Sequence, residues 1–153
     1  MHFTNLLTTI SLLSTGALAA ALPSEADANT NSNSLTKRTD FSGANLICYP
    51  DHIWDRAGRE AINNGIDYLR GVPGQPVAGP GPGACARVSC SYNSAIWWCN
   101  DDPAGKTLAS FGSIADGARH ISLNCNTGGF NGVLSGQVFH HTGWNVIVRK
   151  DVC

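Results

Sequence analysis

All six cysteines of this chain lie after the dibasic pair Lys37-Arg38, and this distribution constrains the fold more than any other feature. They are Cys48, Cys85, Cys90, Cys99, Cys125 and Cys153. An even number of cysteines in a small exported domain predicts disulfides, and six cysteines allow 15 pairings that the sequence does not decide. No Cys-x-x-Cys pair occurs, which disfavours zinc binding. We therefore predict one small domain, residues 39–153, held together by three disulfides.

The segment before the cysteines has the layout of a secretory leader followed by a pro-segment. Residues 1–21 have an apolar centre, too short to span a bilayer, followed by small residues where a signal peptidase could cut. Residues 22–38 are rich in Ser, Asn, Ala and Thr, lack aromatic residues and end in Lys37-Arg38. Such a composition predicts disorder, and an accessible dibasic pair suits the subtilisin-like processing proteases of the secretory pathway. We expect a secreted fungal protein without stable membrane insertion, cleaved after Arg38.

The charge balance argues against partners that are recognised by charge alone. The formal net charge of the chain is −1. Removing residues 1–38 leaves this charge unchanged, because two basic and two acidic residues are lost. A near-neutral surface has no long-range attraction for phosphate backbones or anionic lipid. We expect a monomer that binds no nucleic acid.

Hydrophobic periodicity after Arg38 predicts the order strand, helix, two strands, helix, two strands. The strands are expected at residues 44–48, 86–91, 95–99, 136–141 and 144–149. The first helix is expected to begin at Asp51 as its N-cap and to end at Gly71. The second helix is predicted from Phe111 to Cys125, because apolar residues recur there every three or four positions. A helix of this kind needs a sheet face to cover its apolar side.

These elements predict an α+β fold, a two-layer α/β sandwich. It has a mainly antiparallel sheet of about five strands, with two helices on one face and three disulfides. Residues 71–83, dominated by Gly and Pro, are expected to form an exposed loop, either a tolerated insertion or a recognition loop. Residues 124–132 are expected to form a turn.

Four short patterns lie in the second half of the chain: Val88-Ser-Cys90, the Asn93-Ser94 turn, the helix ending near Cys125, and Gly136-Gln137 leading to Cys153. With these patterns the stretch from Ala86 to Cys153 resembles the KP4-like killer toxin family of small secreted fungal proteins. The resemblance implies a disulfide-bonded α/β sandwich without a catalytic centre. It also implies growth inhibition of susceptible cells, in the founding toxin by interference with calcium channels. Relatives in plant-associated fungi are treated as candidate effectors.

Lysines and tryptophans supply the candidate binding residues. The founding toxin is basic and its activity is linked to a surface lysine, whereas Lys106 and Lys150 are the only lysines after Arg38. Adjacent residues on a strand point to opposite faces, so one of Trp97 and Trp98 should enter the core and the other should face away. The candidate binding residues are Trp98, Trp144, Lys106 and Lys150. The partner would be an extracellular membrane protein or a cell-wall glycan; packing of the rings against neighbouring strands is the alternative.

A small secreted ribonuclease is the enzyme alternative, and the sequence supports it weakly. The residues of the required types are Glu60, His52, His120, His140, His141, Arg87 and Arg149. Glu60 is the only glutamate after Arg38, and neighbours such as His140 and His141 on one strand should point to opposite faces. No Gly-x-Ser-x-Gly motif occurs, and disulfides would consume every thiol nucleophile. We therefore expect a protein that is not an enzyme, with no catalytic residues, metal or cofactor.

Overall fold

The computed structural model describes residues 37–125 and 132–153. The expected signal peptide at 1–21 and the expected disorder up to residue 36 lie outside the described residues, as does most of the turn expected at 124–132. Lys37 and Arg38 are the first described residues, and both are exposed.

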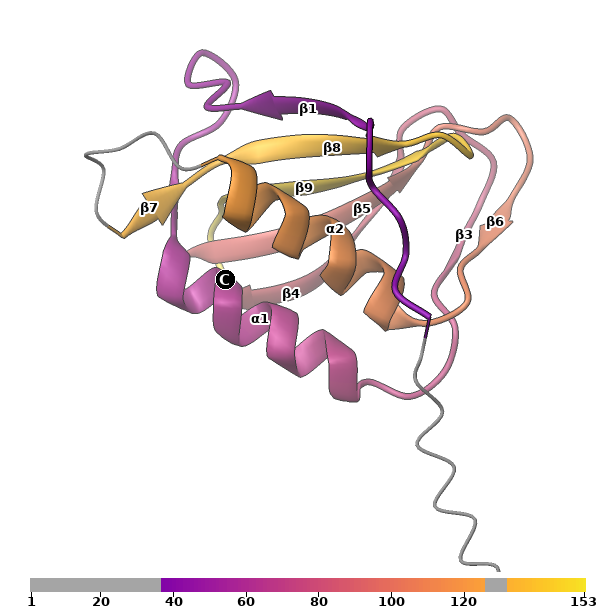
Figure 1. Cartoon of the computed structure of the whole chain (residues 1–153), viewed down its shortest axis with the longest axis horizontal. Helices are drawn as coiled ribbons and strands as arrows, with labels where there is room; N and C mark the ends of the chain where they lie inside the picture. The colour runs from indigo at the N-terminus through magenta and orange to yellow at the C-terminus, as the bar shows by residue number, and fades with distance from the viewer. Residues whose placement is uncertain (1–36, 126–131) are drawn as a thin grey trace, which may run out of the picture. The chain divides into compact units, whose positions relative to one another are not determined.

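Five strands form one antiparallel sheet in the order β1-β8-β9-β5-β4 (Figure 1). These strands are β1 (Asn45–Cys48), β4 (Ala84–Ser91), β5 (Ser94–Asn100), β8 (Gly136–His140) and β9 (Trp144–Lys150). Tight turns join β4 to β5 and β8 to β9, whereas β1 pairs with β8 over a long separation in sequence. The predicted α+β class with two helices, about five antiparallel strands and three disulfides is confirmed.

Both helices lie on the same face of the sheet, α1 from Arg59 to Gly71 and α2 from Phe111 to Asn124 (Figure 1). Glycines on their buried sides allow a close approach. A Cβ on Gly65 would lie 2.7 Å from the hydroxyl oxygen of Ser89 on β4, and one on Gly117 would lie 2.6 Å from a methyl of Val146 on β9. The core therefore fills a thin layer between helices and sheet. Its residues include Ile62, Leu69, Ile96, Trp98, Ile114, Ile121, Val138, Trp144, Val146 and Val148.

The prediction that the first helix begins after Asp51 is wrong, because α1 begins at Arg59. Residues 51–53 form a turn, and the Asp51 carboxylate accepts hydrogen bonds from the guanidinium of Arg56 instead of capping a helix. Residues 57–58 are then held extended as strand β2 (Ala57–Gly58), which pairs with β7 (Val133–Leu134). This pairing gives the backbone of Ala57 and Gly58 partners on β7, so these residues are held outside the helix.

The Gly/Pro segment between α1 and β4 is more ordered than its composition predicts. Within it, β3 (Val77–Ala78) pairs with β6 (Lys106–Thr107). Asn100, at the end of β5, is fully buried, and its side-chain nitrogen donates to the carbonyl oxygens of Gly79 at 2.9 Å and Ala104 at 2.6 Å. One buried amide thus fixes two loops against the sheet.

Three disulfides tie the elements together: Cys48–Cys125, Cys85–Cys99 and Cys90–Cys153. The first joins edge strand β1 to the end of α2, the second crosses from β4 to β5, and the third joins β4 to the end of the chain. All six cysteines are paired, as the even count predicts.

Candidate functional site

The strand register determines which side chains lie on the sheet face that the helices leave uncovered. Trp98, Val146 and Val138 pair across β5, β9 and β8 and are buried under the helices. Their neighbours along each strand point the other way. The register aligns these neighbours in one row across all five strands: Ile47, Gln137, Ile147, Trp97 and Arg87. We call the surface around this row the open face.

The open face combines apolar side chains with amides held in place. Ile47 on the edge strand is 42% exposed, and Ile147 is partly exposed in the middle of the sheet. Gln137 Nε2 donates to Asn145 Oδ1 at 3.0 Å, and Asn145 Nδ2 donates to Asp101 Oδ2 at 2.6 Å. This chain of hydrogen bonds fixes both amides; Asn145 is buried and Gln137 is partly exposed on the open face.

Trp97 is the centre of a charged cluster on the open face, made of Arg87, Trp97, Arg149 and Asp151 and called here the Trp97 cluster. The guanidinium carbons of Arg149 and Arg87 lie 5.1 and 5.8 Å from the centre of a Trp97 ring, within cation–π range. Trp97 Nε1 donates to Asp151 Oδ2 at 3.1 Å, and the same oxygen lies 3.3 Å from Arg149 and 3.7 Å from Arg87. The cluster holds the indole ring rigidly.

Asp151 stays ionised within this cluster. Burial by itself raises the pKa of its carboxyl group, but the hydrogen bond from the Val152 N–H and the charge of Arg149 lower it more. The Trp97 indole and Arg87 act in the same direction, so the pKa of Asp151 lies below its usual range. The carboxylate therefore neutralises part of the charge of the two arginines at neutral pH.

The structure places the predicted tryptophans in the core. Trp98 is 1% exposed and Trp144 is 2% exposed, so neither can present a ring to a ligand at the surface. The alternative, packing of these two rings against neighbouring strands, is what the structure shows, whereas Trp97 and Phe139 lie on the open face. Alternation along β9 contains the missing signal: Trp144 shares a face with Val146 and Val148, which is an apolar run typical of a covered face.

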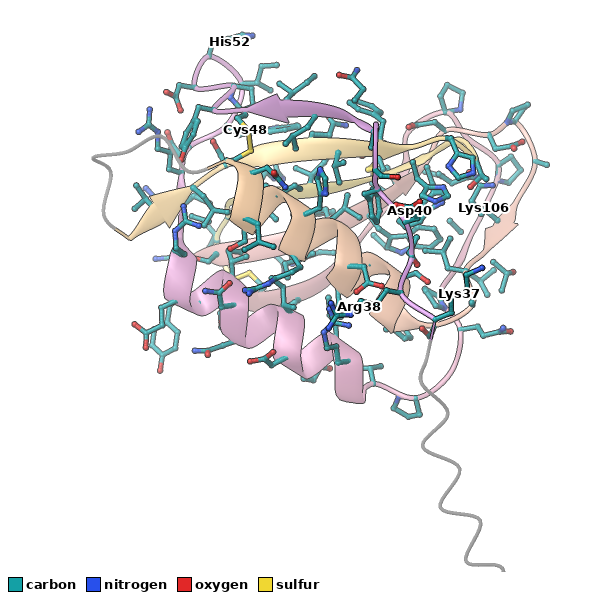
Figure 2. The ribbon with its side chains drawn as sticks, viewed as in Figure 1. Lys37, Arg38, Asp40, Cys48, His52 and Lys106 are labelled. Atoms are coloured by element: carbon teal, nitrogen blue, oxygen red, sulfur yellow. A yellow bond between two sulfur atoms is a disulfide. The ribbon has the colours of Figure 1, made fainter. Side chains whose placement is uncertain are left out.

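The two predicted lysines lie at opposite ends of strand β5. Lys150 pairs with Ser94 at the start of β5, and its ammonium lies 3.7 Å from Asp55. Lys106 lies near the other end, where its ammonium is 3.8 Å from Asp102 (Figure 2). The structure therefore does not bring Lys106 and Lys150 together into one cationic site.

Two histidines that were expected on opposite faces come together. His140 ends strand β8 whereas His141 lies in the turn that follows, so strand alternation does not separate them. Their ring centres are 4.2 Å apart, and the His140 ring also stacks on Trp144 at 4.9 Å. Phe41 lies against the His140 ring edge to face, with 5.3 Å between ring centres.

His140 has its pKa lowered from the ordinary value. Burial is the main cause, followed by the charges of His141 and Lys106, while Asp40 acts in the opposite direction. Thr142 N–H donates to His140 Nδ1 at 3.3 Å. A neutral imidazole beside a second histidine is the type of pair that can carry general acid–base chemistry.

Other components of the ribonuclease hypothesis lie elsewhere. Glu60 lines a separate hollow with Ala61, Asn64 and Tyr92, and His52 is exposed in the turn after β1 (Figure 2). Arg87 and Arg149 belong to the Trp97 cluster. The residues that the ribonuclease alternative would need are thus divided among separate clusters.

The described residues offer neither a metal-binding cluster nor a membrane-spanning helix. Residues 37–125 and 132–153 contain no group of three or more His, Cys, Asp or Glu side chains placed to hold a metal ion. In the same part of the chain, no helix is both long enough and apolar enough to cross a membrane.

Comparisons with protein-family models, with curated proteins and with solved structures found no match. The resemblance to the KP4-like family therefore rests on the sequence patterns described above.

Proposed function

We propose that this chain is a secreted protein, matured after Lys37-Arg38, that binds a target on other cells through the open face. At the surface of those cells it would act as a killer-toxin-like or effector protein, for example by interfering with ion channels. The observation that carries the proposal is the row of side chains across all five strands, which neither helix of the described residues covers and which ends in the Trp97 cluster. Three disulfides suit an oxidising compartment outside the cell.

The arrangement of the open face favours binding over catalysis. Partly buried aromatic and arginine side chains are the residue types that dominate protein interfaces, and rigid positioning lowers the entropy lost on association. The two arginines of the Trp97 cluster share the single carboxylate of Asp151, which neutralises part of their charge and leaves them less able to stabilise a reacting anion. Recognition by shape and by apolar contact fits this surface better.

A binding assay on sensitive fungal or plant cells tests this proposal. We expect Ile47→Glu to weaken binding of the mature protein about tenfold or more, because it puts a charge on the open face. Leu123→Glu is the matched control, since Leu123 is an exposed aliphatic residue on α2, on the opposite side of the sheet. Equal affinity of the two variants would contradict a role for the open face.

Parallel measurements separate the alternative functions. Growth inhibition of the same cells, with and without added calcium, tests the toxin hypothesis, and no inhibition at micromolar protein counts against it. Selective binding on a glycan array would favour a cell-wall carbohydrate binder. Digestion of RNA that is lost in His140→Ala would favour the small ribonuclease, for which the contact between His140 and His141 is the supporting observation.

A further inference from the structure

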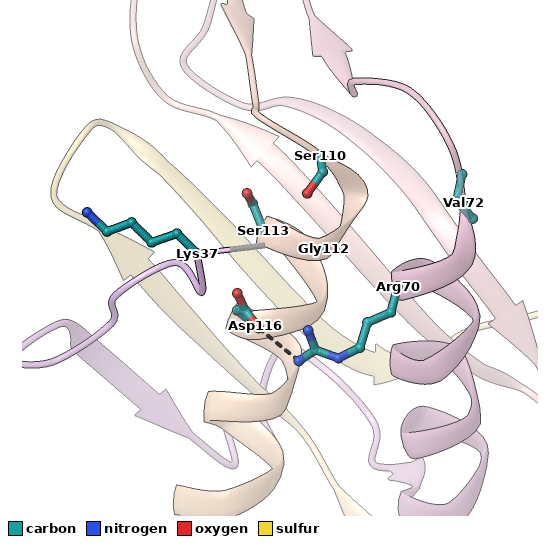
Figure 3. A pocket seen from close by; sticks show the side chains of 7 residues that line it. All are labelled: Lys37, Arg70, Val72, Ser110, Gly112, Ser113 and Asp116. Carbon is teal, nitrogen blue, oxygen red and sulfur yellow. Dashed lines mark hydrogen bonds and ion pairs between the residues drawn. The ribbon is translucent and has the colours of Figure 1, made fainter. Parts of the chain in front are cut away.

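The backbone nitrogen of Thr39, the residue after the dibasic pair, lies against a nearly buried carboxylate. Thr39 N donates to Asp116 Oδ2 at 2.7 Å. Arg70 Nη2 donates to the other oxygen of Asp116 at 2.8 Å, the contact drawn as a dashed line in Figure 3. The Asp116 side chain is only 10% exposed and borders a hollow of about 230 Å³ between the end of α1 and the start of α2. One carboxylate therefore connects α1, α2 and the segment that enters the fold.

The contacts that position this nitrogen come from residues after Arg38. We call residues 39–44 the N-terminal arm. Phe41 is 4% exposed and packs against Trp144, with 5.6 Å between ring centres. Asp40 accepts hydrogen bonds from the backbone and hydroxyl of Ser42, which shapes the arm into a turn. Lys37 and Arg38, by contrast, are exposed. Cleavage between Arg38 and Thr39 would thus leave the docking of the arm intact.

We propose that cleavage after Arg38 creates an amino terminus at Thr39 whose ammonium group binds Asp116 and locks the N-terminal arm onto the two helices. The inference rests on the maturation included in the proposed function. A processing protease with dibasic specificity hydrolyses the peptide bond: water gives its oxygen to the Arg38 carboxylate, and the Thr39 nitrogen leaves as an amine that is protonated at neutral pH. Asp116 is the binding site for this new cation.

Cleavage changes the character of the contact without moving its atoms. Before cleavage, a neutral amide with a single N–H donates to Asp116. Afterwards an ammonium with three N–H groups and a full positive charge occupies the same place, and charge-assisted hydrogen bonds are roughly twice as strong as neutral ones. Cleavage also removes the charges of Lys37 and Arg38 from the surface above α2. The mature arm should therefore be held more firmly than the arm of the precursor.

The effect has a defined pH dependence. The charged and titratable groups around the Thr39 nitrogen are Arg70 from α1, Asp116, Arg119 and His120 from α2, and Asp40 from the arm. Pairing with Asp116 should raise the pKa of the new α-amino group, against the opposing charges of Arg70 and Arg119. A raised pKa means that the stabilisation is complete below the pKa of the unfolded chain and is lost as the pH rises through the folded value.

Thermal denaturation of cleaved and uncleaved full chains tests the proposal. Intact mass first establishes that the secreted wild-type protein begins at Thr39, and a Lys37→Ala/Arg38→Ala variant provides the uncleaved chain. We expect the cleaved protein to melt roughly 5 °C higher at neutral pH. This gain should vanish in an Asp116→Asn background and persist in Asp67→Asn, a matched charge change on the exposed side of α1.

A third chain keeps the proposal testable even if the Asp116→Asn variant misfolds. It begins with one glycine placed before Thr39, which moves the ammonium by about 3.8 Å and restores the amide. We expect its melting temperature to match that of the uncleaved chain. An equal gain in this chain or in Asp116→Asn, no gain on cleavage, or a secreted protein that begins elsewhere would overturn the proposal. Cell binding by the open face is measured separately, so the proposed function can hold while this inference fails.

Discussion

Gly117 determines how closely α2 approaches the sheet. An added Cβ would lie 2.6 Å from Val146 and 2.9 Å from the Phe41 ring, so both neighbours would have to move. Phe41 anchors the N-terminal arm, and Val146 lies in the central part of the core. Because Gly117 has no side chain, α2 can contact both the sheet and the N-terminal arm at this position.

We expect Gly117→Ala to lower the free energy of unfolding by about 1–3 kcal/mol, because the core around it is already filled. Urea denaturation of the mature protein measures this change. Gly71→Ala is the matched control: an added Cβ there meets nothing within 4 Å, and the variant should be neutral or slightly more stable. A neutral result at Gly117 would show that the helix can shift without cost.

His140 makes stability depend on pH in the acidic range. Because its pKa is lowered in the folded protein, its contribution is complete above the ordinary value of 6.5 and is lost as the pH falls through the folded value. We expect the melting temperature to fall as the pH drops below about 6.5, and to fall less in His140→Gln. His52→Gln, an exposed site, is the control and should follow the wild type. Parallel curves for the wild type and His140→Gln would contradict this prediction.

Side-chain alternation alone could predict that Trp97 and Trp98 lie on opposite faces, but not which one is exposed. That choice depends on long-range pairing, which places Trp98 beside Val146 and Trp97 beside Ile147. The contact between His140 and His141 could not be predicted from the sequence either, because it depends on β8 ending one residue before the predicted boundary. Register and strand ends are set by tertiary hydrogen bonds, which local periodicity does not contain.

At the scale of elements, periodicity predicted both helices and all five strands of the main sheet. The two small ladders, β2 with β7 and β3 with β6, escaped prediction, because two-residue strands have no period to detect. The late start of α1 has the same origin, since Ala57 and Gly58 are held by β7 and not by their neighbours in sequence. The pairing of the cysteines likewise required the fold.

The disulfides should differ in what they contribute. Cys48–Cys125 joins residues 77 apart and Cys85–Cys99 residues 14 apart, so closing the longer loop removes more entropy from the unfolded chain. We expect Cys48→Ala/Cys125→Ala to lower the free energy of unfolding by about 4–5 kcal/mol, and Cys85→Ala/Cys99→Ala by about 3 kcal/mol. Urea denaturation of each variant measures the difference. A larger loss for the shorter loop would contradict the entropic explanation.

At the scale of the whole molecule, the two faces of the sheet have different roles. One face is covered by α1 and α2 and forms the core, while the other carries the open face (Figure 1). Thr39 is hydrogen-bonded to the Asp116 carboxylate, and Cys153 is bonded to Cys90 of β4. Both segments are thus tied to the folded domain.

The irregular edge strand β4 has a consequence for the protein at high concentration. Its pairing register with β5 shifts between Arg87 and Ser89, and its residues Cys85 and Cys90 both form disulfides. A bulged, cross-linked edge is a poor template for a strand from another molecule. At the opposite edge, β1 has only four residues. Neither edge of the main sheet therefore favours the addition of a strand from another molecule, and we expect the protein to resist growth into extended β-sheet fibres.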